Sequence, residues 1–269
     1  MSESSPGRPH SLLGSSIGLK FVMGATGVVL VGFVLAHMAG NLQIYLGSDV
    51  FNHYAQTLKG TPPLLWTVRV VVLSAVLLHI ASAWRLTQKN WAARPQPYAS
   101  PRRYDRTGYA ALFMRGSGLV VLAFIIFHLL HFTIGTIQHE HFVLHEVLRG
   151  DVWVREENVK ILAALPEHMQ RHDAYSMFVR GFQSPIVAGA YILANLLLGR
   201  HLSHGVASGF ATLGYSKGGQ RQLAERIGTT IATLVTLGNL SFPIAVLAGV
   251  VHLRRSPRSH RHGPQRTHP

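Results

Sequence analysis

Hydrophobic residues along this chain are gathered into five long blocks that are separated by polar loops. A helix needs about 20 apolar residues, at 1.5 Å per residue, to cross the hydrocarbon core of a bilayer, and each block reaches that length. Only helices suit these blocks in lipid, because an open strand would leave its backbone groups unpaired. The pattern predicts an all-α membrane protein with five transmembrane helices. These helices are expected at about residues 17–45, 64–86, 110–137, 184–203 and 227–253.

The segments outside the blocks are polar. Residues 1–16 lack the short apolar core and cleavage site of a signal peptide, and they are predicted to form a cytoplasmic N-terminal segment. Residues 254–269 form a basic tail without apolar periodicity, which predicts disorder. Within the long loop between the third and fourth blocks, residues 158–169 are moderately amphipathic and predict a short interfacial helix or a cap.

Composition agrees with a membrane protein. Of 269 residues, 48% are hydrophobic and only 13% are charged. A net charge of +14 would suggest nucleic acid in a soluble protein. Here the basic residues lie between apolar blocks and in the tail, so membrane topology and anionic lipid headgroups explain them and no nucleic-acid partner is expected. The chain has no cysteine, which excludes disulfides, covalently attached c-type haem and thiolate ligation of an iron–sulfur cluster by this chain.

Lysine and arginine concentrate in the loop after the second block and in the loop after the fourth. Because cytoplasmic loops carry an excess of these residues, the N-terminus is predicted to lie in the cytoplasm. The arginine-rich tail disagrees, since five helices would place it outside, but internal loops carry more weight. The residues that decide the orientation are Arg85, Lys89, Arg94, Arg102, Arg103, Arg106, Arg115, Lys217, Arg221 and Arg226.

The first four apolar blocks each contain a histidine near one end. Counted outward from Leu19, His37 lies 18 residues along the first helix, and counted from Leu112, His128 lies 16 residues along the third. At 1.5 Å per residue, both are roughly 24 to 27 Å deep, near the outer face. The second and fourth helices run the other way, so His79 and His201 are expected near the inner face. The four histidines thus sort into an outer pair and an inner pair.

Two imidazoles that face each other across a helix bundle suit the axial ligands of a b-type haem, and two levels would make an electron path across the membrane. A single histidine in a membrane helix more often bridges helices, but four at matched depths favour haem. We therefore expect the first four helices to form a bundle that holds two haem b. His131 and His204 lie three residues after His128 and His201, so spacing alone does not choose within each couple.

A transporter for a divalent metal would also place imidazoles in membrane helices. Such a protein is expected to add carboxylates inside the helices and to gather its ligands at one depth. None of the five predicted helix interiors contains Asp or Glu, and the histidines occupy two depths. The transporter is therefore the weaker interpretation.

Several motifs resemble those of a known family. The chain resembles the cytochrome b membrane-anchor subunit of succinate:quinone oxidoreductases, in the single-chain, five-helix, two-haem form found with menaquinone. The resemblance covers about residues 11–250, and its most specific part is HLSHG followed by FATLG. The segments that carry it are SLLGSSIGLKFVMGATG, AHMAGNLQIYLG, FNHYAQTL, RGSGLVVLAFIIFHLLHFT and DAYSMFVRGFQSPIVAGAYILANLLLGRHLSHGVASGFATLG.

The resemblance implies which residues hold the haem iron. The first histidine of the HLSHG motif, His201, is the ligand from the fourth helix, and His128, thirteen residues after Arg115, is that from the third. His37 and His79 match the ligands of the first two helices. The family pairs first with third and second with fourth, as depth does here. Four further residues could contact haem propionates or quinone, or could only bridge helices or reach headgroups: His131, His204, Arg115 and Arg200.

The implied function belongs to a complex in the bacterial cytoplasmic membrane. A flavoprotein subunit oxidises succinate, an iron–sulfur subunit relays the electrons, and this multi-pass anchor passes them through the two haems to menaquinone at a quinone-reduction site. The anchor itself is not catalytic for succinate, and the whole complex could form a higher oligomer. A fumarate reductase would use the same parts in the opposite direction. The cytochrome b of a hydrogenase or formate dehydrogenase is a neighbouring alternative, against which the HLSHG segment argues.

The chain departs from the family pattern where protons would be handled. Relatives carry a carboxylate near the outer end of the first helix, whereas this loop offers Asp49, His53 and Tyr54 without a glutamate. Gly199 stands where relatives with a transmembrane proton path carry glutamate. We therefore expect protons for the quinone to come from the nearer aqueous face.

Overall fold

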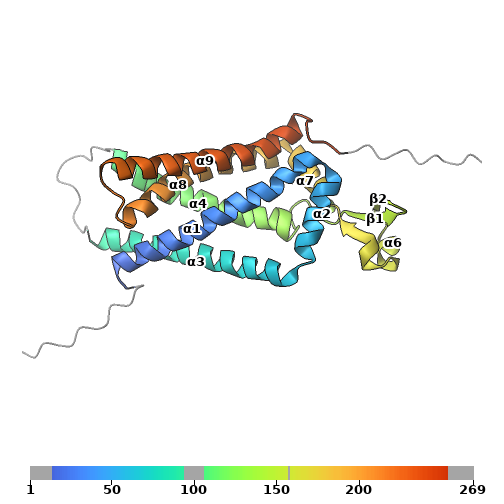
Figure 1. Ribbon diagram of the computed structural model, residues 1–269, viewed down its shortest axis with the longest axis horizontal. Coiled ribbons are helices and arrows are strands. Elements are labelled where there is room, and N and C mark those ends of the chain that lie inside the picture. Colours follow the sequence, from blue (N-terminus) through green and yellow to red (C-terminus); the bar gives the residue numbers. More distant parts are fainter. Residues whose placement is uncertain (1–13, 94–105, 157, 254–269) are drawn as a thin grey trace, which may run out of the picture.

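Five long helices run lengthwise through the protein in the computed structural model, which describes residues 14–93, 106–156 and 158–253 (Figure 1). Each of the five is long and apolar enough to cross a membrane, so the prediction of a helical, multi-pass membrane protein is confirmed. The predicted tail, 254–269, and most of the predicted N-terminal segment lie outside the described residues. The five helices are α1 (Ser16–Asn41), α3 (Pro62–Ala92), α4 (Arg106–His128), α8 (Pro185–Thr212) and α9 (Gly218–Leu247).

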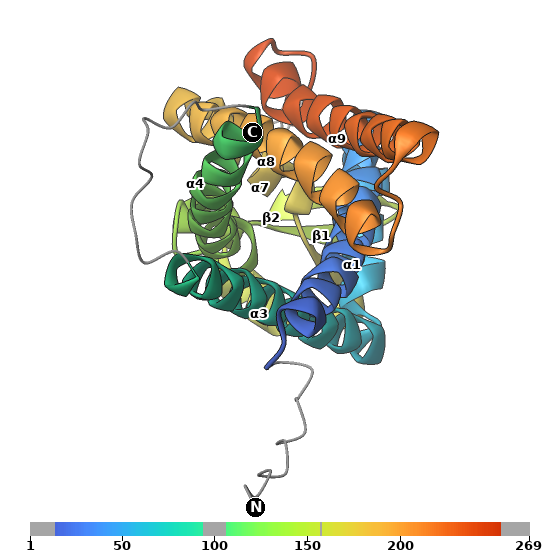
Figure 2. The same ribbon diagram turned by 90° about the vertical axis from the view of Figure 1, so that its left-hand side faces the viewer.

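The four histidine-bearing helices form two packed pairs. α1 packs along α3, and α4 packs along α8. Seen along the bundle, α1, α3, α4 and α8 stand around a four-sided arrangement, with α9 outside it (Figure 2). α9 packs mainly on α8 and also touches α1, so it supports the four-helix unit from one side. Its close approach to α8 depends on small residues: a Cβ added at Gly228 would lie 2.8 Å from the carbonyl oxygen of Ser203.

The helix ends differ from the apolar blocks in both directions. α3 and α8 continue to Ala92 and Thr212, beyond the predicted ends at 86 and 203, because polar residues such as Lys89 also favour helix once the chain has left the hydrocarbon. α4 instead passes into a short π-helix, η2 (Leu129–Thr133), before the predicted end at 137. Gly135 follows with a φ of 75°, a backbone conformation that stops a right-handed helix.

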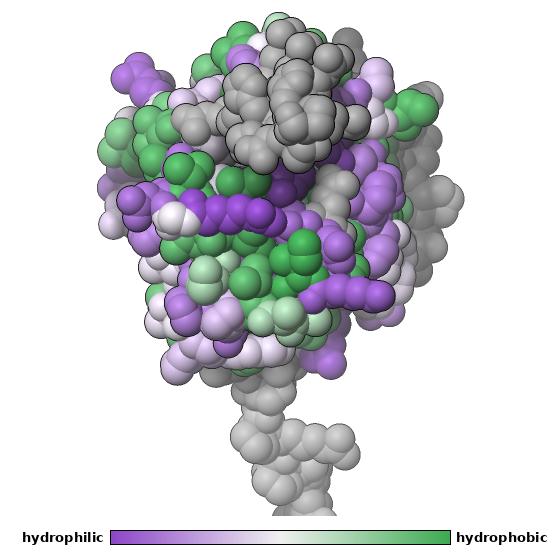
Figure 3. All heavy atoms as spheres, turned by 90° about the vertical axis from the view of Figure 1, so that its right-hand side faces the viewer, coloured by the Kyte–Doolittle hydropathy of each residue, from purple (hydrophilic) through white to green (hydrophobic). Residues whose placement is uncertain are grey.

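A small folded cap covers one end of the bundle. Its three-stranded antiparallel sheet has the order β2-β1-β3, and the predicted amphipathic segment 158–169 supplies a helix and a 3-10 turn. The strands were not expected, because segments this short give no hydrophobic run. Figure 3 shows hydrophilic and hydrophobic side chains mixed over this end. The cap comprises η1 (Leu42–Leu46), α2 (Ser48–Lys59), α5 (His139–Phe142), β1 (His145–Arg149), β2 (Val152–Glu156), α6 (Val159–Ala164), η3 (Glu167–Met169), β3 (Gln170–His172) and α7 (Ala174–Gln183).

A buried polar network ties α2 to the sheet and to α7. Asn52 is 0% exposed, and its amide nitrogen lies 3.1 Å from both Glu146 Oε2 and Asp173 Oδ1. The guanidinium of Arg171 donates to Glu146 Oε2 at 2.7 Å and to Asp49 Oδ1 at 2.9 Å. Because buried charges are costly unless they are paired, this network holds the cap in one arrangement.

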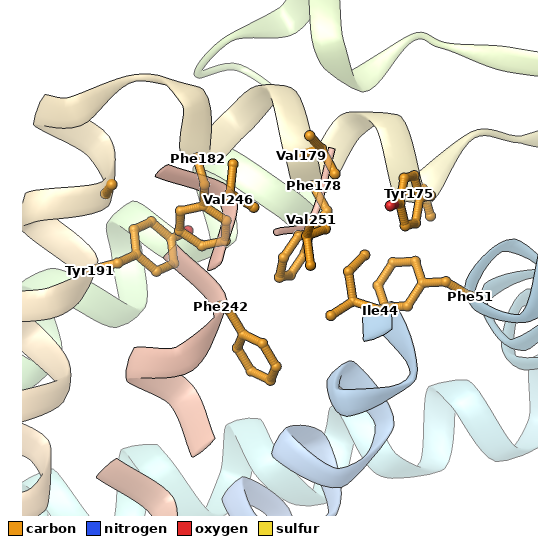
Figure 4. Packing of buried hydrophobic residues seen from close by; sticks show 12 residues of the cluster. Ile44, Phe51, Tyr175, Phe178, Val179, Phe182, Tyr191, Phe242, Val246 and Val251 are labelled. Atoms are coloured by element: carbon orange, nitrogen blue, oxygen red, sulfur yellow. The ribbon is translucent and has the colours of Figure 1, made fainter. Parts of the chain in front are cut away.

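An aromatic cluster joins the cap to the bundle. α7 buries one face against it, as its apolar residues alternate with polar ones at helical spacing. Figure 4 shows Tyr191 of α8 beside Phe182 at one end of the cluster, with Phe51 of α2 and Tyr175 at the other. The rings of Phe182 and Tyr191 are 4.8 Å apart between centroids, in an edge-to-face arrangement. The end of α8 near the cap is therefore firmly packed.

Candidate functional site

The histidines of the four-helix unit lie at two levels. We call the end that carries the cap the outer end and the end at which α1 begins the inner end, whichever aqueous compartment each faces. At the outer level the rings of His37 on α1 and His128 on α4 have centroids 5.7 Å apart and planes inclined by 84°. Two imidazoles on opposite sides of one metal ion, each at about 2 Å, would have centroids about 6 Å apart. The structure thus brings these two histidines to a separation that suits shared ligation.

At the inner level, His79 on α3 is held through one ring nitrogen. Its Nδ1 lies 3.1 Å from the carbonyl oxygen of Met23 and 3.2 Å from the hydroxyl of Thr26, both on α1. That hydroxyl donates in turn to the carbonyl oxygen of Val22 at 2.8 Å. A proton on Nδ1 satisfies both contacts, and the Nε2 lone pair of His79 is then free.

His201 on α8 is held in the same manner by α4. Its Nδ1 is 3.2 Å from the hydroxyl of Ser117, which lies 3.3 Å from the carbonyl oxygen of Met114. The imidazole of His201 is within electrostatic range of that of His79. The two side chains therefore occupy one level, each anchored to the helix with which its own helix is paired.

The two anchoring hydroxyls belong to a repeat within the chain. Thr26 is followed by glycine and precedes His37 by eleven residues, and Ser117 is followed by glycine and precedes His128 by the same eleven. Eleven residues of helix span about 16 Å, which is the rise between the two levels. The two helix pairs are thus matching units, and each contributes one histidine to each level. Neither hydroxyl is predicted above, although this equal spacing is visible in the sequence.

The glycines of the repeat lie against the inner imidazoles. A Cβ added at Gly27 would lie 3.6 Å from His79 Cε1, and one added at Gly118 would lie 3.5 Å from His201 Cε1. These distances are ordinary van der Waals contacts. The two glycines therefore leave the inner imidazoles in contact with the backbone of α1 and α4 without a side chain between them.

The free nitrogens distinguish His37 from the other three histidines. Among the described residues, Nε2 of His79, His128 and His201 has no hydrogen-bond partner. Nε2 of His37 instead lies 3.2 Å from the amide nitrogen of Asn41, one turn further along α1. Three of the four predicted ligands therefore present the nitrogen that commonly binds iron or zinc. His37 presents it only after the contact with Asn41 is released.

The two alternative histidines differ from their neighbours. His131 is 3% exposed and uses both ring nitrogens: Nδ1 is 3.0 Å from the hydroxyl of Tyr191 and Nε2 is 2.8 Å from Gln138 Oε1. His204 is half-buried and makes no hydrogen bond within the described residues, although it is in electrostatic range of His201. Neither side chain combines an anchored nitrogen with a free one, which is the pattern at His128 and His201.

The two predicted arginines lie on aromatic rings at the inner end. The guanidinium carbon of Arg115 is 5.9 Å from the centroid of Trp91, and that of Arg200 is 5.6 Å from the centroid of Phe113. Both arginines are exposed. Cation–π contacts of this kind keep a basic group near the edge of an apolar region without pairing it to an acid.

The outer loop is occupied by structural contacts. Asp49 is ion-paired with Arg171, and the hydroxyl of Tyr54 packs directly against Gly40. Burial, with the neighbouring ammonium of Lys59, lowers the pKa of His172 to about 4. The Nε2 of His172 lies 2.7 Å from the carbonyl oxygen of Phe142.

Asp173 is an acid whose charge the cap stabilises. Burial alone would raise its pKa, but hydrogen bonds from Ser176 and Asn52 and the charge of Arg155 outweigh burial and hold that pKa below its ordinary value. Arg155 also donates to the hydroxyl of Ser176. The acid therefore remains ionised and keeps α7 joined to the sheet.

Comparison with known proteins adds no relative. No family model matches the chain, and neither a curated protein nor a solved structure matches it. Among residues 14–93, 106–156 and 158–253, no group of three or more His, Asp or Glu side chains could hold a metal ion.

Proposed function

We propose that this chain is the dihaem cytochrome b anchor of a succinate:quinone oxidoreductase. His37 and His128 would be the axial ligands of an outer haem b, and His79 and His201 those of an inner one. The observation that carries the proposal is the arrangement of these histidines in two pairs, at two levels, on helix pairs that repeat one another.

The residues present fit a bis-histidine haem. A metal-bound histidine usually donates its other ring N–H to an oxygen acceptor, which fixes the ring and raises the basicity of the ligand. Oxygen acceptors lie beside Nδ1 of His79, His128 and His201. The haems would supply one-electron chemistry, and the chain supplies their ligands, spacing and surroundings.

The distribution of charge supports the proposed orientation and partners. Among the described acidic residues, all but Glu225 lie at the outer end, whereas basic residues such as Lys89 and Arg115 lie at the inner end. By the positive-inside rule, the lysines and arginines at the inner end support our proposal that this end faces the bacterial cytoplasm. Electrons would come from a flavoprotein through an iron–sulfur subunit docked there, reach the inner haem first and leave from the outer haem to menaquinone.

The experiment is succinate-driven haem reduction in native membranes. Adding succinate is expected to reduce b-type haem in membranes that contain this chain, and a competitive dicarboxylate inhibitor should block the reduction. His201→Ala should abolish the inner-haem part of the signal, and His204→Ala is the matched control that keeps it. Haem that is reduced by hydrogen or formate but not by succinate would contradict the proposal and favour the cytochrome of another dehydrogenase.

A further inference from the structure

A chain of three polar contacts runs from the outer loop to His128. Gln138 Oε1 lies 2.8 Å from His131 Nε2, His131 Nδ1 lies 3.0 Å from the hydroxyl of Tyr191, and that hydroxyl lies 3.2 Å from His128 Nδ1. Tyr191 comes from α8, whereas His128 and His131 come from α4 and η2. The chain therefore links two helices and a loop to one proposed ligand.

With His131 neutral, these contacts admit one assignment of protons. The amide oxygen of Gln138 can only accept, so His131 Nε2 carries the proton and donates it. His131 Nδ1 must then accept from the hydroxyl of Tyr191. The tyrosine oxygen, whose only proton points to His131, must accept from His128 Nδ1–H. His128 is thus held in the tautomer that leaves the lone pair of Nε2 free.

The backbone has unusual conformations at two residues of this hydrogen-bonded chain, Gln138 and His131. Gln138 has φ 55° and ψ 47°, and among the described residues it is the only one other than glycine with a positive φ. Such a residue is uncommon and points to a constraint on its side chain. His131 sits in the π-helix η2, a local widening that is frequent at functional sites. Its ring stacks on Phe132 at 3.9 Å between centroids and lies against Gly181, where an added Cβ would be 3.1 Å away.

We propose that Gln138, His131 and Tyr191 are positioning residues that set the tautomer, the ring orientation and the donor strength of His128. This inference rests on the proposed function, because it concerns one haem ligand. An acceptor on Nδ1–H makes an imidazole a stronger donor and favours the ferric state. The hydrogen-bonded chain from Gln138 to His128 therefore lowers the midpoint potential of the outer haem relative to a site without it. The inner histidines lack such a chain: Nδ1 of His79 contacts the hydroxyl of Thr26 and the carbonyl oxygen of Met23, and Nδ1 of His201 contacts the hydroxyl of Ser117.

Tyr191→Phe tests the proposal, since it removes the hydroxyl and keeps the ring in its aromatic cluster. Redox titration of the purified protein in detergent, followed by visible and electron paramagnetic resonance spectra, resolves the two haems. The outer haem should rise in potential and change its ferric g values, while the inner haem keeps both. A tenfold change in the preference for the ferrous state corresponds to about 59 mV for one electron.

Tyr45→Phe is the matched control. Its hydroxyl also lies at the outer end and donates to Ser241 Oγ at 2.8 Å, but it contacts no histidine. Neither potential should move in this variant. Equal shifts in both tyrosine variants, or equal shifts of both haems in Tyr191→Phe, would show a general loosening of the bundle and would overturn the proposal.

Variants of His131 separate hydrogen bonding from packing. His131→Leu fills space without an acceptor and should reproduce the shift of Tyr191→Phe. His131→Asn offers an amide oxygen near the position of Nδ1 and should restore most of the original potential. Unchanged outer-haem potentials in both Tyr191→Phe and His131→Leu would refute the positioning role while leaving the proposed function intact. A protein that binds no haem at all would contradict both the positioning role and the proposed function.

Discussion

The inner and outer levels hold their histidines in different ways. At the inner level both imidazoles rest on a hydroxyl from the partner helix, Thr26 for His79 and Ser117 for His201, and the two contacts have the same length of 3.2 Å. At the outer level the supports differ in kind. An amide within the same helix contacts His37, whereas a chain that reaches the outer loop ends on His128.

This difference follows from what surrounds each level. The inner level depends only on helices, so a repeated sequence produces repeated contacts. The outer level lies beneath the cap, and the residues that shape it come from a π-helix, a loop and the aromatic cluster. A symmetrical helix bundle thus becomes asymmetrical where the loops meet it. Two haems held in such sites would be expected to differ in potential.

The largest expected effect is the loss of one haem of two. His79→Ala or His201→Ala should remove the inner haem alone, and His37→Ala or His128→Ala the outer haem alone, because each change deletes a proposed axial ligand. The haem-to-protein ratio should fall by half, and resonance spectra should show which signal is lost.

Alanine at the neighbouring histidines is the control for the ligand series. His131→Ala and His204→Ala should retain both haems. Haem loss in His204→Ala with retention in His201→Ala would reverse the assignment at the inner level. Loss of both haems in each single variant would mean that the two levels are not independent sites.

The next effect concerns acid stability, which should distinguish the outer end from the inner. Burial and the neighbouring ammonium of Lys59 lower the pKa of His172 from 6.5 in the unfolded chain to about 4 in the folded cap, so the unfolded cap binds more protons between these pH values. Cap stability should be full above pH 6.5 and should fall as the pH drops towards 4, by at most about 3 kcal/mol. Asp173, with a depressed pKa, loses its contribution only at still lower pH.

Amide hydrogen exchange in β1 and β3 measures this effect. Exchange in the sheet should accelerate relative to that in α8 as the pH is lowered through this window, after correction for the intrinsic dependence of exchange on pH. His172→Gln removes the titrating group and should flatten the dependence. A sheet whose corrected protection is constant from pH 7 to 4 would contradict the prediction.

A smaller effect tests the hydroxyl supports of the inner level. Ser117→Ala removes the hydroxyl that accepts from His201, at about 1 kcal/mol, or roughly 40 mV for one electron, and should raise the potential of the inner haem. Thr26→Val leaves His79 Nδ1 beside the carbonyl oxygen of Met23 and should raise that potential by less, and both variants should leave the outer haem unchanged. Thr26→Ser, which keeps the hydroxyl, is the matched control. Equal shifts in the two variants would show that the carbonyl oxygen of Met23 does not support His79.

The smallest effect is expected at Asn41. Because its amide occupies Nε2 of His37, Asn41→Ala should ease binding at the outer level and increase haem affinity there by a few fold, about 1 kcal/mol or less. Titration of haem into the haem-free protein measures this change. Reduced affinity would mean that Asn41 supports the bound state instead of competing with it.

Much of this architecture is predictable from the chain. Five apolar blocks are enough to predict five membrane helices, and counting residues from the block ends placed His37 with His128. Thr26 and Ser117 could have been found by aligning the two blocks on their histidines. The ends of α4 and α9 could not be predicted from the sequence. They depend on glycines with a positive φ, and a run of apolar residues does not reveal that conformation.

The residues that support His128 at the outer level, and the strands of the cap, could not be predicted from the sequence. Tyr191 is an aromatic residue within an apolar helix, and nothing in the sequence around it marks its hydroxyl as functional. The hydroxyl finds its partners, His128 and His131, only when α4 packs beside α8. Gln138 contributes through a backbone conformation that its own residue type does not favour. The short strands of the cap pair through the backbone, so their sequence carries little hydrophobic signal.

The most direct test of the account is the reduced-minus-oxidised visible spectrum of the purified protein, together with its haem content. Low-spin bands of bis-histidine b haem at two haems per chain are predicted, with two separate potentials on titration. A protein purified intact from cells that make haem, yet without those bands, would contradict the central claim.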